Sequence, residues 1–192
     1  IREIYKDLTR YCDIDGILFH DDAYFNDYED ASESALKHYR KKWGIKKSIL
    51  QIREDKSLLR KWTDLKSNFL TDFTKEIMND TLQFRGSLYF ARNIFARPVL
   101  SAESETWFSQ SYRNFLDTYN YTAIMAMPYM EGAQKPLKWL ENLVKTAKKE
   151  DPELKKTIFE LQAMDWNTKK HIPAETLLKQ MDVLILNGAL NF

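Results

Sequence analysis

The sequence predicts an α/β fold with a parallel sheet, organised as the later part of a (β/α)8 TIM-like barrel with about five βα units. Two observations support this prediction. Short apolar runs typical of strands covered on both faces alternate with segments of helical periodicity along the whole chain. Polar side chains also gather directly after those runs. We expect residues 1–192 to form one partial barrel domain that lacks the first strands of the barrel.

Five apolar runs are expected to form the strands. The first is a continuous run that stops at two adjacent aspartates, and Pro128 follows the third run. The fourth leads into the polar stretch Asp165-Trp166-Asn167. These runs cover residues 14–19, 87–90, 122–127, 157–164 and 188–192.

Helical spacing fills the intervals between the runs. Gly44 suits the end of one helix, and Pro136 and Pro173 suit the first turns of two others. The apolar positions that define the helices are Ile1, Ile4, Leu8 and Tyr11; Leu36, Tyr39 and Trp43; Leu58 to Ile77; Phe108, Tyr112, Phe115 and Tyr119; Leu137, Leu140 and Val144; and Leu177, Leu178 and Met181.

A doubly wound sheet is the alternative architecture, but no glycine-rich phosphate loop follows any of the runs. The chain has 192 residues, whereas a complete barrel usually has about 250. Five βα units therefore fit the second part of a barrel.

The composition argues against several classes of protein. The 29 basic residues balance the 28 acidic ones, which is unlike a nucleic-acid-binding protein. No stretch reaches the roughly 18 apolar residues of a membrane span. Cys12 is the only cysteine, which argues against an internal disulfide and a multi-thiolate metal site. The first residue is Ile1 rather than Met, so we expect a processed or excised N-terminus.

Polar side chains follow the predicted strands. The carboxyl ends of barrel strands share one face, and that face holds the active site in barrel enzymes. We therefore expect these side chains to converge there. They are His20, Asp21 and Asp22, then Asp27 and Glu29 in the loop; Arg92 and Asn93; Tyr129 and Glu131; Asp165, Trp166 and Asn167; and Asn191.

Structural explanations exist for some of these residues. An aspartate after a strand often caps a helix or forms a turn, and Asp27 and Asp30 could simply open the next helix. Adjacent side chains on a strand point to opposite faces, so one of Asp21 and Asp22 is expected to be structural. A tryptophan such as Trp166, taken alone, is more often a core residue than a platform for a ligand.

Glycoside cleavage fits the polar residues expected at the carboxyl ends of the strands, the mouth of the barrel, better than metal chemistry does. The chain has three histidines, and none stands in an HxH or HExxH spacing, so we expect no histidine-built metal site and no cofactor. Cleavage of a glycosidic bond needs one protonated carboxyl and one ionised carboxylate. A crowded acidic cluster supplies both groups, because repulsion between neighbouring carboxylates raises the pKa of one of them while the others stay ionised. No GxSxG nucleophile motif is present.

The stretch DGILFHDDAYFNDYEDAS, residues 15–32, resembles the C-terminal domain of bacterial poly-β-1,6-N-acetylglucosamine N-deacetylases, which are biofilm exopolysaccharide proteins. The resemblance runs along the chain through SETWFSQSY around Trp107, MAMPYMEG from Met125 and MDWN from Met164. The first motif is specific, and the shorter ones are weak when taken alone.

This resemblance implies a two-domain protein of the periplasm or outer membrane. Its N-terminal deacetylase domain is expected to be absent from this chain, and its C-terminal barrel would bind and hydrolyse partly deacetylated polymer. An outer-membrane export porin is a further implied partner. The resemblance places acidic groove residues at Asp21, Asp22, Asp27 and Glu29 and an aromatic one at Trp107, and Tyr129 and Trp166 are companions by position.

Our hypothesis is that Asp21 or Asp22 is the catalytic acid or its carboxylate partner, and that Asp27 and Glu29 shape the pKa values and bind amines. His20, Glu131 and Asp165 are further candidates for substrate binding. Deacetylated sugars carry ammonium groups, which an acidic mouth attracts. Two alternatives remain. One is a binding module that guides polymer towards export without cleaving it, and the other is a barrel hydrolase of neutral glycans.

Overall fold

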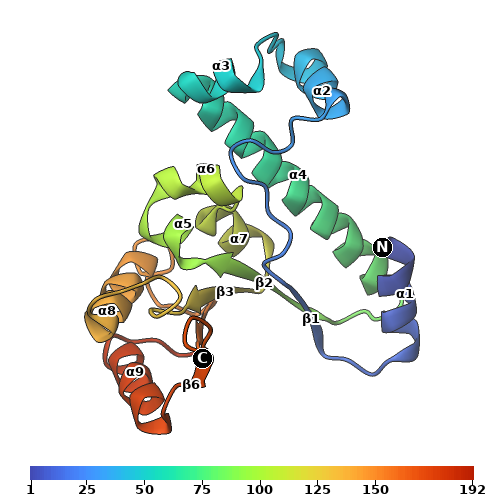
Figure 1. Ribbon diagram of the computed structural model, residues 1–192. Helices are drawn as coiled ribbons and strands as arrows, with labels where there is room; N and C mark the ends of the chain where they lie inside the picture. The colour runs from blue at the N-terminus through green and yellow to red at the C-terminus, as the bar shows by residue number, and fades with distance from the viewer.

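Four of the five predicted runs pair into one parallel sheet in the order β1-β2-β3-β4 (Figure 1). The computed structural model describes residues 1–192. The predicted α/β class and parallel sheet are confirmed. The strands are β1 (Gly16–Phe19), β2 (Tyr89–Phe95), β3 (Tyr121–Ala126) and β4 (Thr157–Leu161).

The fifth predicted strand was wrong. Residues 188–192 contribute a single bridge between Asn191 and Ile158, beside β4. The chain turns at Gly188, whose φ of 91° lies in the left-handed region, just before this bridge.

Two strand ends also differ from the prediction. β2 runs on to Phe95, so Arg92 and Asn93 lie inside the strand rather than after it. β4 stops at Leu161, and the chain then forms a small antiparallel hairpin of β5 (Met164–Asp165) and β6 (Lys170–His171).

The helices begin and end with local signals that the sequence carries. The Ser32 hydroxyl accepts a hydrogen bond from the Ala35 N–H at the start of α2, and Gly44 ends that helix with a φ of 67°. None of the helices is both long and apolar enough to cross a membrane. They are α1 (Arg2–Tyr11), α2 (Glu33–Trp43), α3 (Ile49–Glu54), α4 (Lys56–Leu82), α5 (Ala96–Leu100), the 3-10 turn η1 (Ala102–Ser104), α6 (Glu105–Phe108), α7 (Tyr112–Thr118), α8 (Pro136–Ala147) and α9 (Ala174–Leu186).

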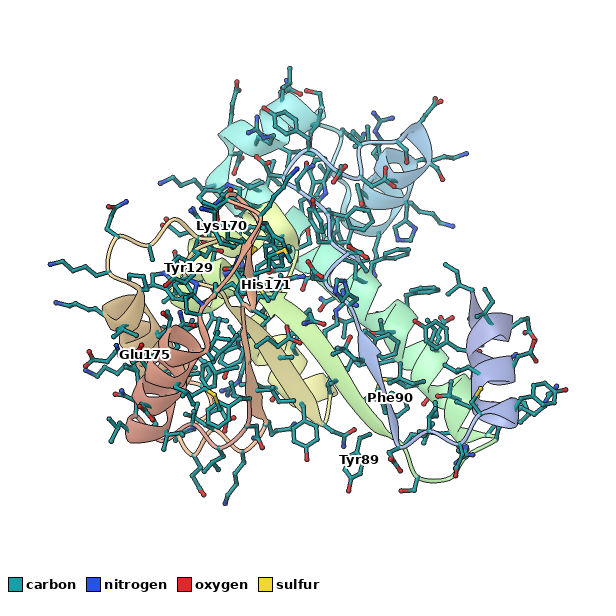
Figure 2. All side chains as sticks on the ribbon, turned by 60° about the horizontal axis from the view of Figure 1, so that its bottom comes forward. Tyr89, Phe90, Tyr129, Lys170, His171 and Glu175 are labelled. Carbon is teal, nitrogen blue, oxygen red and sulfur yellow. The ribbon has the colours of Figure 1, made fainter.

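The main core lies on one face of the sheet. Phe19, Phe90 and Phe159 are buried there among residues from the helices. The intervening side chains point to the other face, where Leu18 is 48% and Tyr89 is 59% exposed. Figure 2 shows Tyr89 at the end of the sheet where β2 begins, whereas Tyr129 and His171 lie towards the opposite end.

A smaller core joins α2, α3 and the first half of α4. It contains Tyr39, Ile45, Ile52, Trp62 and Leu65. α4 has 27 residues and is therefore about 40 Å long, so it extends well past the sheet. Figure 1 shows α2 and α3 at the far end of α4 from α1. The long connection from β1 to α2 crosses between the sheet and this helical unit.

Candidate functional site

The two aspartates that end β1 differ in their exposure. The Nδ1 atom of His20 lies 2.6 Å from Oδ1 of Asp21 and 3.5 Å from Oδ2 of Asp22. The Asp21 side chain is 14% exposed, whereas the Asp22 side chain is 92% exposed. Ligand atoms of all three side chains lie within 4.8 Å of one another, so they could hold a cation. Asp21 is therefore the covered member of the pair, and Asp22 is open to solvent.

Glu160 of β4 adds another carboxyl to this part of the sheet. Its Oε2 accepts a hydrogen bond from the side-chain amide of Asn93 in β2. Burial raises the pKa of Glu160, and the charge of Asp21 adds to that rise, while Asn93 and His20 oppose it. The site thus combines a carboxyl whose pKa is raised, Glu160, with the exposed side chain of Asp22.

Glu160 was not predicted from the sequence, because it lies inside a strand rather than after one. The available signal was a glutamate in the otherwise apolar stretch TIFEL. A carboxylate in a strand of a mostly buried sheet needs a partner or a function. Asn93 was a candidate, but its position beside Glu160 follows only from the pairing of three strands.

The loop that follows the two aspartates is fixed from two sides. Nη2 of the buried Arg92 donates a hydrogen bond of 2.6 Å to the carbonyl oxygen of Ala23. The Ser109 hydroxyl donates to the carbonyl oxygen of Phe25 over 2.8 Å. Burial lowers the pKa of Arg92, and nearby Asp21 opposes that change. The Arg92 side chain therefore fixes the start of this loop to β2.

Lys66 of α4 holds the next part of the same loop. Its ammonium donates to the carbonyl oxygen of Asn26 over 2.5 Å and also to that of Glu29. Lys66 is only 1% exposed. Burial lowers the pKa of Lys66 to about 8, although Asp27, Glu29 and Asp30 raise it. Lys66 thus fixes the backbone on either side of two predicted catalytic residues.

Asp27 and Glu29 make their contacts within this loop region. The Asp27 carboxylate accepts a hydrogen bond of 2.7 Å from Nε of Arg53, and the guanidinium lies 3.7 Å from the centre of the Tyr28 ring. The Glu29 carboxylate accepts a hydrogen bond of 3.0 Å from the Asn26 N–H. The structure therefore does not join them to the group formed by His20, Asp21 and Asp22. Their catalytic role stays a prediction.

The other predicted residues lie after β2, β3 and β4. Trp107 in α6 is 47% exposed, and Trp166 in the β5–β6 hairpin is 52% exposed, so both offer a ring face to solvent. Glu131 accepts a hydrogen bond of 2.9 Å from Arg97. The Asp165 carboxylate accepts from the Asn167 N–H and the Thr168 hydroxyl, which closes the hairpin turn. Tyr129 lies in the turn after β3.

The chain matches known proteins along nearly its whole length. A protein-family model described as hypothetical glycosyl hydrolase family 13 matches residues 1–192. The chain is 43% identical over 195 residues to the poly-beta-1,6-N-acetyl-D-glucosamine N-deacetylases of Escherichia coli K12 and Escherichia coli O157:H7. The match covers 98% of this chain but only 29% of the length of each relative.

A solved structure is also similar to this chain in both fold and sequence. The glycoside hydrolase domain of PgaB (BpsB) from Bordetella bronchiseptica superimposes with a TM-score of 0.92 at 42% sequence identity. That match covers 99% of this chain and 54% of the other chain. The resemblance to the poly-β-1,6-N-acetylglucosamine N-deacetylases that the motifs indicated is therefore confirmed.

Proposed function

Because the chain belongs to hypothetical glycosyl hydrolase family 13, we propose that it binds and hydrolyses partly deacetylated poly-β-1,6-N-acetylglucosamine. The observation that carries this proposal is that Glu160, whose pKa is raised by burial, also feels the charge of Asp21 at the end of β1. A protonated carboxyl and an ionised carboxylate are the two groups that glycoside cleavage requires.

In this mechanism Glu160 protonates the glycosidic oxygen as the bond to the anomeric carbon breaks. The proton compensates the charge that develops on the leaving oxygen. The carboxylate of Asp22 or Asp21 then either attacks the anomeric carbon or takes a proton from the water that attacks it. His20 lies within contact distance of both aspartates and can hold their side chains in place.

The substrate class follows from the relatives and from charge. The relatives are named for N-deacetylation of this polymer. Removal of an acetyl group leaves an ammonium on the sugar, and the carboxylates of Asp22 and Glu29 are exposed in the region that would meet it. The exposed faces of Trp107 and Trp166 can stack on sugar rings. Asp27 lies in the same loop as Glu29, and we propose that it also helps to bind the amines of the polymer.

The wider context is part of the same proposal. The four-stranded sheet would form part of a closed (β/α) barrel, and the protein would work in the periplasm or at the outer membrane beside an export porin. The chain spans about 29% of the length of the curated relatives, and their names describe N-deacetylation rather than cleavage. A binding module that guides polymer without turnover is therefore the second candidate.

One experiment separates the two candidates. The intact protein and its Asp22→Asn variant are incubated with partly deacetylated poly-β-1,6-glucosamine, and released oligomers are followed by mass spectrometry. We expect the parent to release shortened products. The Asp22→Asn variant should release at least about 100-fold less oligomer while it still binds the polymer. Intact polymer in both samples with measurable binding would identify a binding module. Equal cleavage of fully acetylated polymer would indicate a hydrolase of neutral glycans.

A further inference from the structure

A cavity of about 560 Å³ lies apart from the group formed by His20, Asp21 and Asp22. One wall is the loop that carries Phe25 and Asp30, and the other walls are α2 and the middle of α4. Cavities that bind small molecules usually have about 300–1,000 Å³. The volume is therefore large enough for a sugar unit.

Aromatic rings form most of the apolar part of the cavity, beside Ala35 and Leu65. Phe69 and Phe73 stand one turn apart on α4, so their side chains share one face of the helix. Phe69 is 63% exposed, which is unusual for a phenylalanine, and no other aromatic ring stacks on it. Tyr39 of α2 and Phe25 of the loop complete the set. These rings offer flat apolar faces of the kind that stack on a pyranose.

The same face of α4 carries carboxylates. Asp72 and Glu76 lie three and seven residues after Phe69, and both are exposed. The Glu76 carboxylate forms an ion pair with the Arg2 guanidinium over 3.0 Å. The Asp72 carboxylate lies 3.8 Å from the Lys75 ammonium. Asp30 adds a third carboxylate, with one oxygen accepting a hydrogen bond from the Ser32 N–H over 2.9 Å.

Two lysines also line the cavity. Lys42 is exposed at α2, and the ammonium of Lys66 is turned to the loop carbonyls that it binds. The lining therefore holds three carboxylates, two lysines and His38, and one of the two ammonium groups is already bound to loop carbonyls. This balance favours a ligand that combines an apolar ring face with a positive charge.

We propose that this cavity is a second polymer-binding site, which takes glucosamine units of the chain whose cleavage is proposed above. The inference rests on that proposed function for its ligand class. The loop that forms one wall begins directly after Asp21 and Asp22, so it connects the two places along the chain. A glucosamine unit stacks on Phe69 and places its ammonium near Asp72, whereas an acetylated unit has no charge for that contact.

The test places a fluorine label in the cavity of the intact protein. Phe69 is replaced by 4-(trifluoromethyl)phenylalanine, and the 19F resonance is followed during titration with a β-1,6-glucosamine pentamer or its fully N-acetylated counterpart. Phe84, which is 39% exposed beyond the end of α4, carries the same label as a matched control. Calorimetry on the unlabelled protein measures total binding of each pentamer.

We expect the resonance at position 69 to shift with the glucosamine pentamer and not with the acetylated one, while position 84 stays unchanged. Asp72→Asn is expected to weaken the affinity at this site by about 3- to 10-fold. No shift at position 69 at concentrations where calorimetry detects binding would overturn this site and leave the proposed function standing. An equal shift with both pentamers would overturn the role of charge. Absence of binding in calorimetry would overturn both proposals together.

Discussion

The ammonium nitrogen of Lys66 lies 2.5 Å from the carbonyl oxygen of Asn26, and it also donates a hydrogen bond to the carbonyl of Glu29. A cation on the long helix α4 thus holds the loop that follows the two aspartates of β1. Arg92 of β2 binds the start of the same loop at the Ala23 carbonyl. Two cations from different elements therefore set the position of the acidic loop relative to the sheet.

Replacement of Lys66 by methionine is expected to change how stability depends on pH. Burial lowers the pKa of Lys66 to about 8, whereas an unfolded lysine titrates near 10.5. Between these values the unfolded chain binds more protons, so the free energy of unfolding of the parent rises with pH across that interval, by up to about 3 kcal/mol. The Lys66→Met variant lacks this rise.

Urea unfolding between pH 7.5 and 10.5 measures the effect. Lys61→Met is the matched control, because Lys61 is exposed on the same helix. Parallel pH profiles for the parent and Lys66→Met would show that the ammonium is not buried in the folded protein.

Glu160 provides a second pH-dependent prediction. Its carboxyl has a raised pKa in the folded protein, so it stabilises the fold below the unfolded value near 4.5, and this contribution is lost as pH rises through the folded pKa. We expect Glu160→Gln to gain stability relative to the parent over that interval. Thermal unfolding of both proteins from pH 4 to 8 checks this, and a constant difference between them would contradict it.

The same residue predicts a pH profile for cleavage. If Glu160 protonates the leaving oxygen, the rate of the parent falls as pH rises through its pKa. Glu160→Gln should lose about 100-fold or more in rate together with that limb of the profile. Oligomer release measured from pH 4 to 9 tests both parts. A variant that keeps the parent's profile would assign the acid to another group.

The pair formed by Asp27 and Arg53 allows a direct test of the predicted catalytic role of Asp27. If Asp27 mainly holds the loop, Asp27→Asn and Arg53→Gln should affect polymer binding similarly, and the double variant should lose little more than either one. The expected coupling is about 1 kcal/mol, because the pair is partly buried and lies at 2.7 Å. A rate loss in Asp27→Asn that far exceeds the loss in Arg53→Gln would instead support catalysis by Asp27.

Substitution of Gly16, at the start of β1, is expected to lower the stability of the fold. A Cβ atom at this position would lie 2.4 Å from the carbonyl oxygen of Tyr89 in the neighbouring strand. Gly16→Ala should therefore destabilise the β1–β2 pairing by about 1–3 kcal/mol, because the obstructing atom belongs to the backbone. Gly86→Ala is the control, since no atom lies within 4 Å of its added Cβ. Chemical denaturation compares the two, and equal stability of both variants would contradict the close approach.

Part of the fold could be predicted because it depends on local patterns. The apolar run that ends at Phe19 and the helical spacing of Leu36, Tyr39 and Trp43 both led to real elements, β1 and α2. Parallel pairing followed from the alternation of strands and helices. Residues 188–192 were predicted as a strand but form only one bridge to β4. A short apolar stretch becomes a strand only if it can form a series of hydrogen bonds with a neighbouring strand, and its own residues do not determine this.

The sequence by itself also determined that Asp21 and Asp22 stand at the end of a strand, since position along the chain is enough for that. Only the tertiary structure decided which groups surround them. Glu160 comes near Asp21 because β1, β2, β3 and β4 pair in that order, and Asp27 meets Arg53 because the loop folds back on α3. Asp27 and Arg53 are 26 positions apart in the chain, and Asp21 and Glu160 are 139 positions apart. Burial and neighbouring charge then set the pKa values, and both arise from packing that no local pattern encodes.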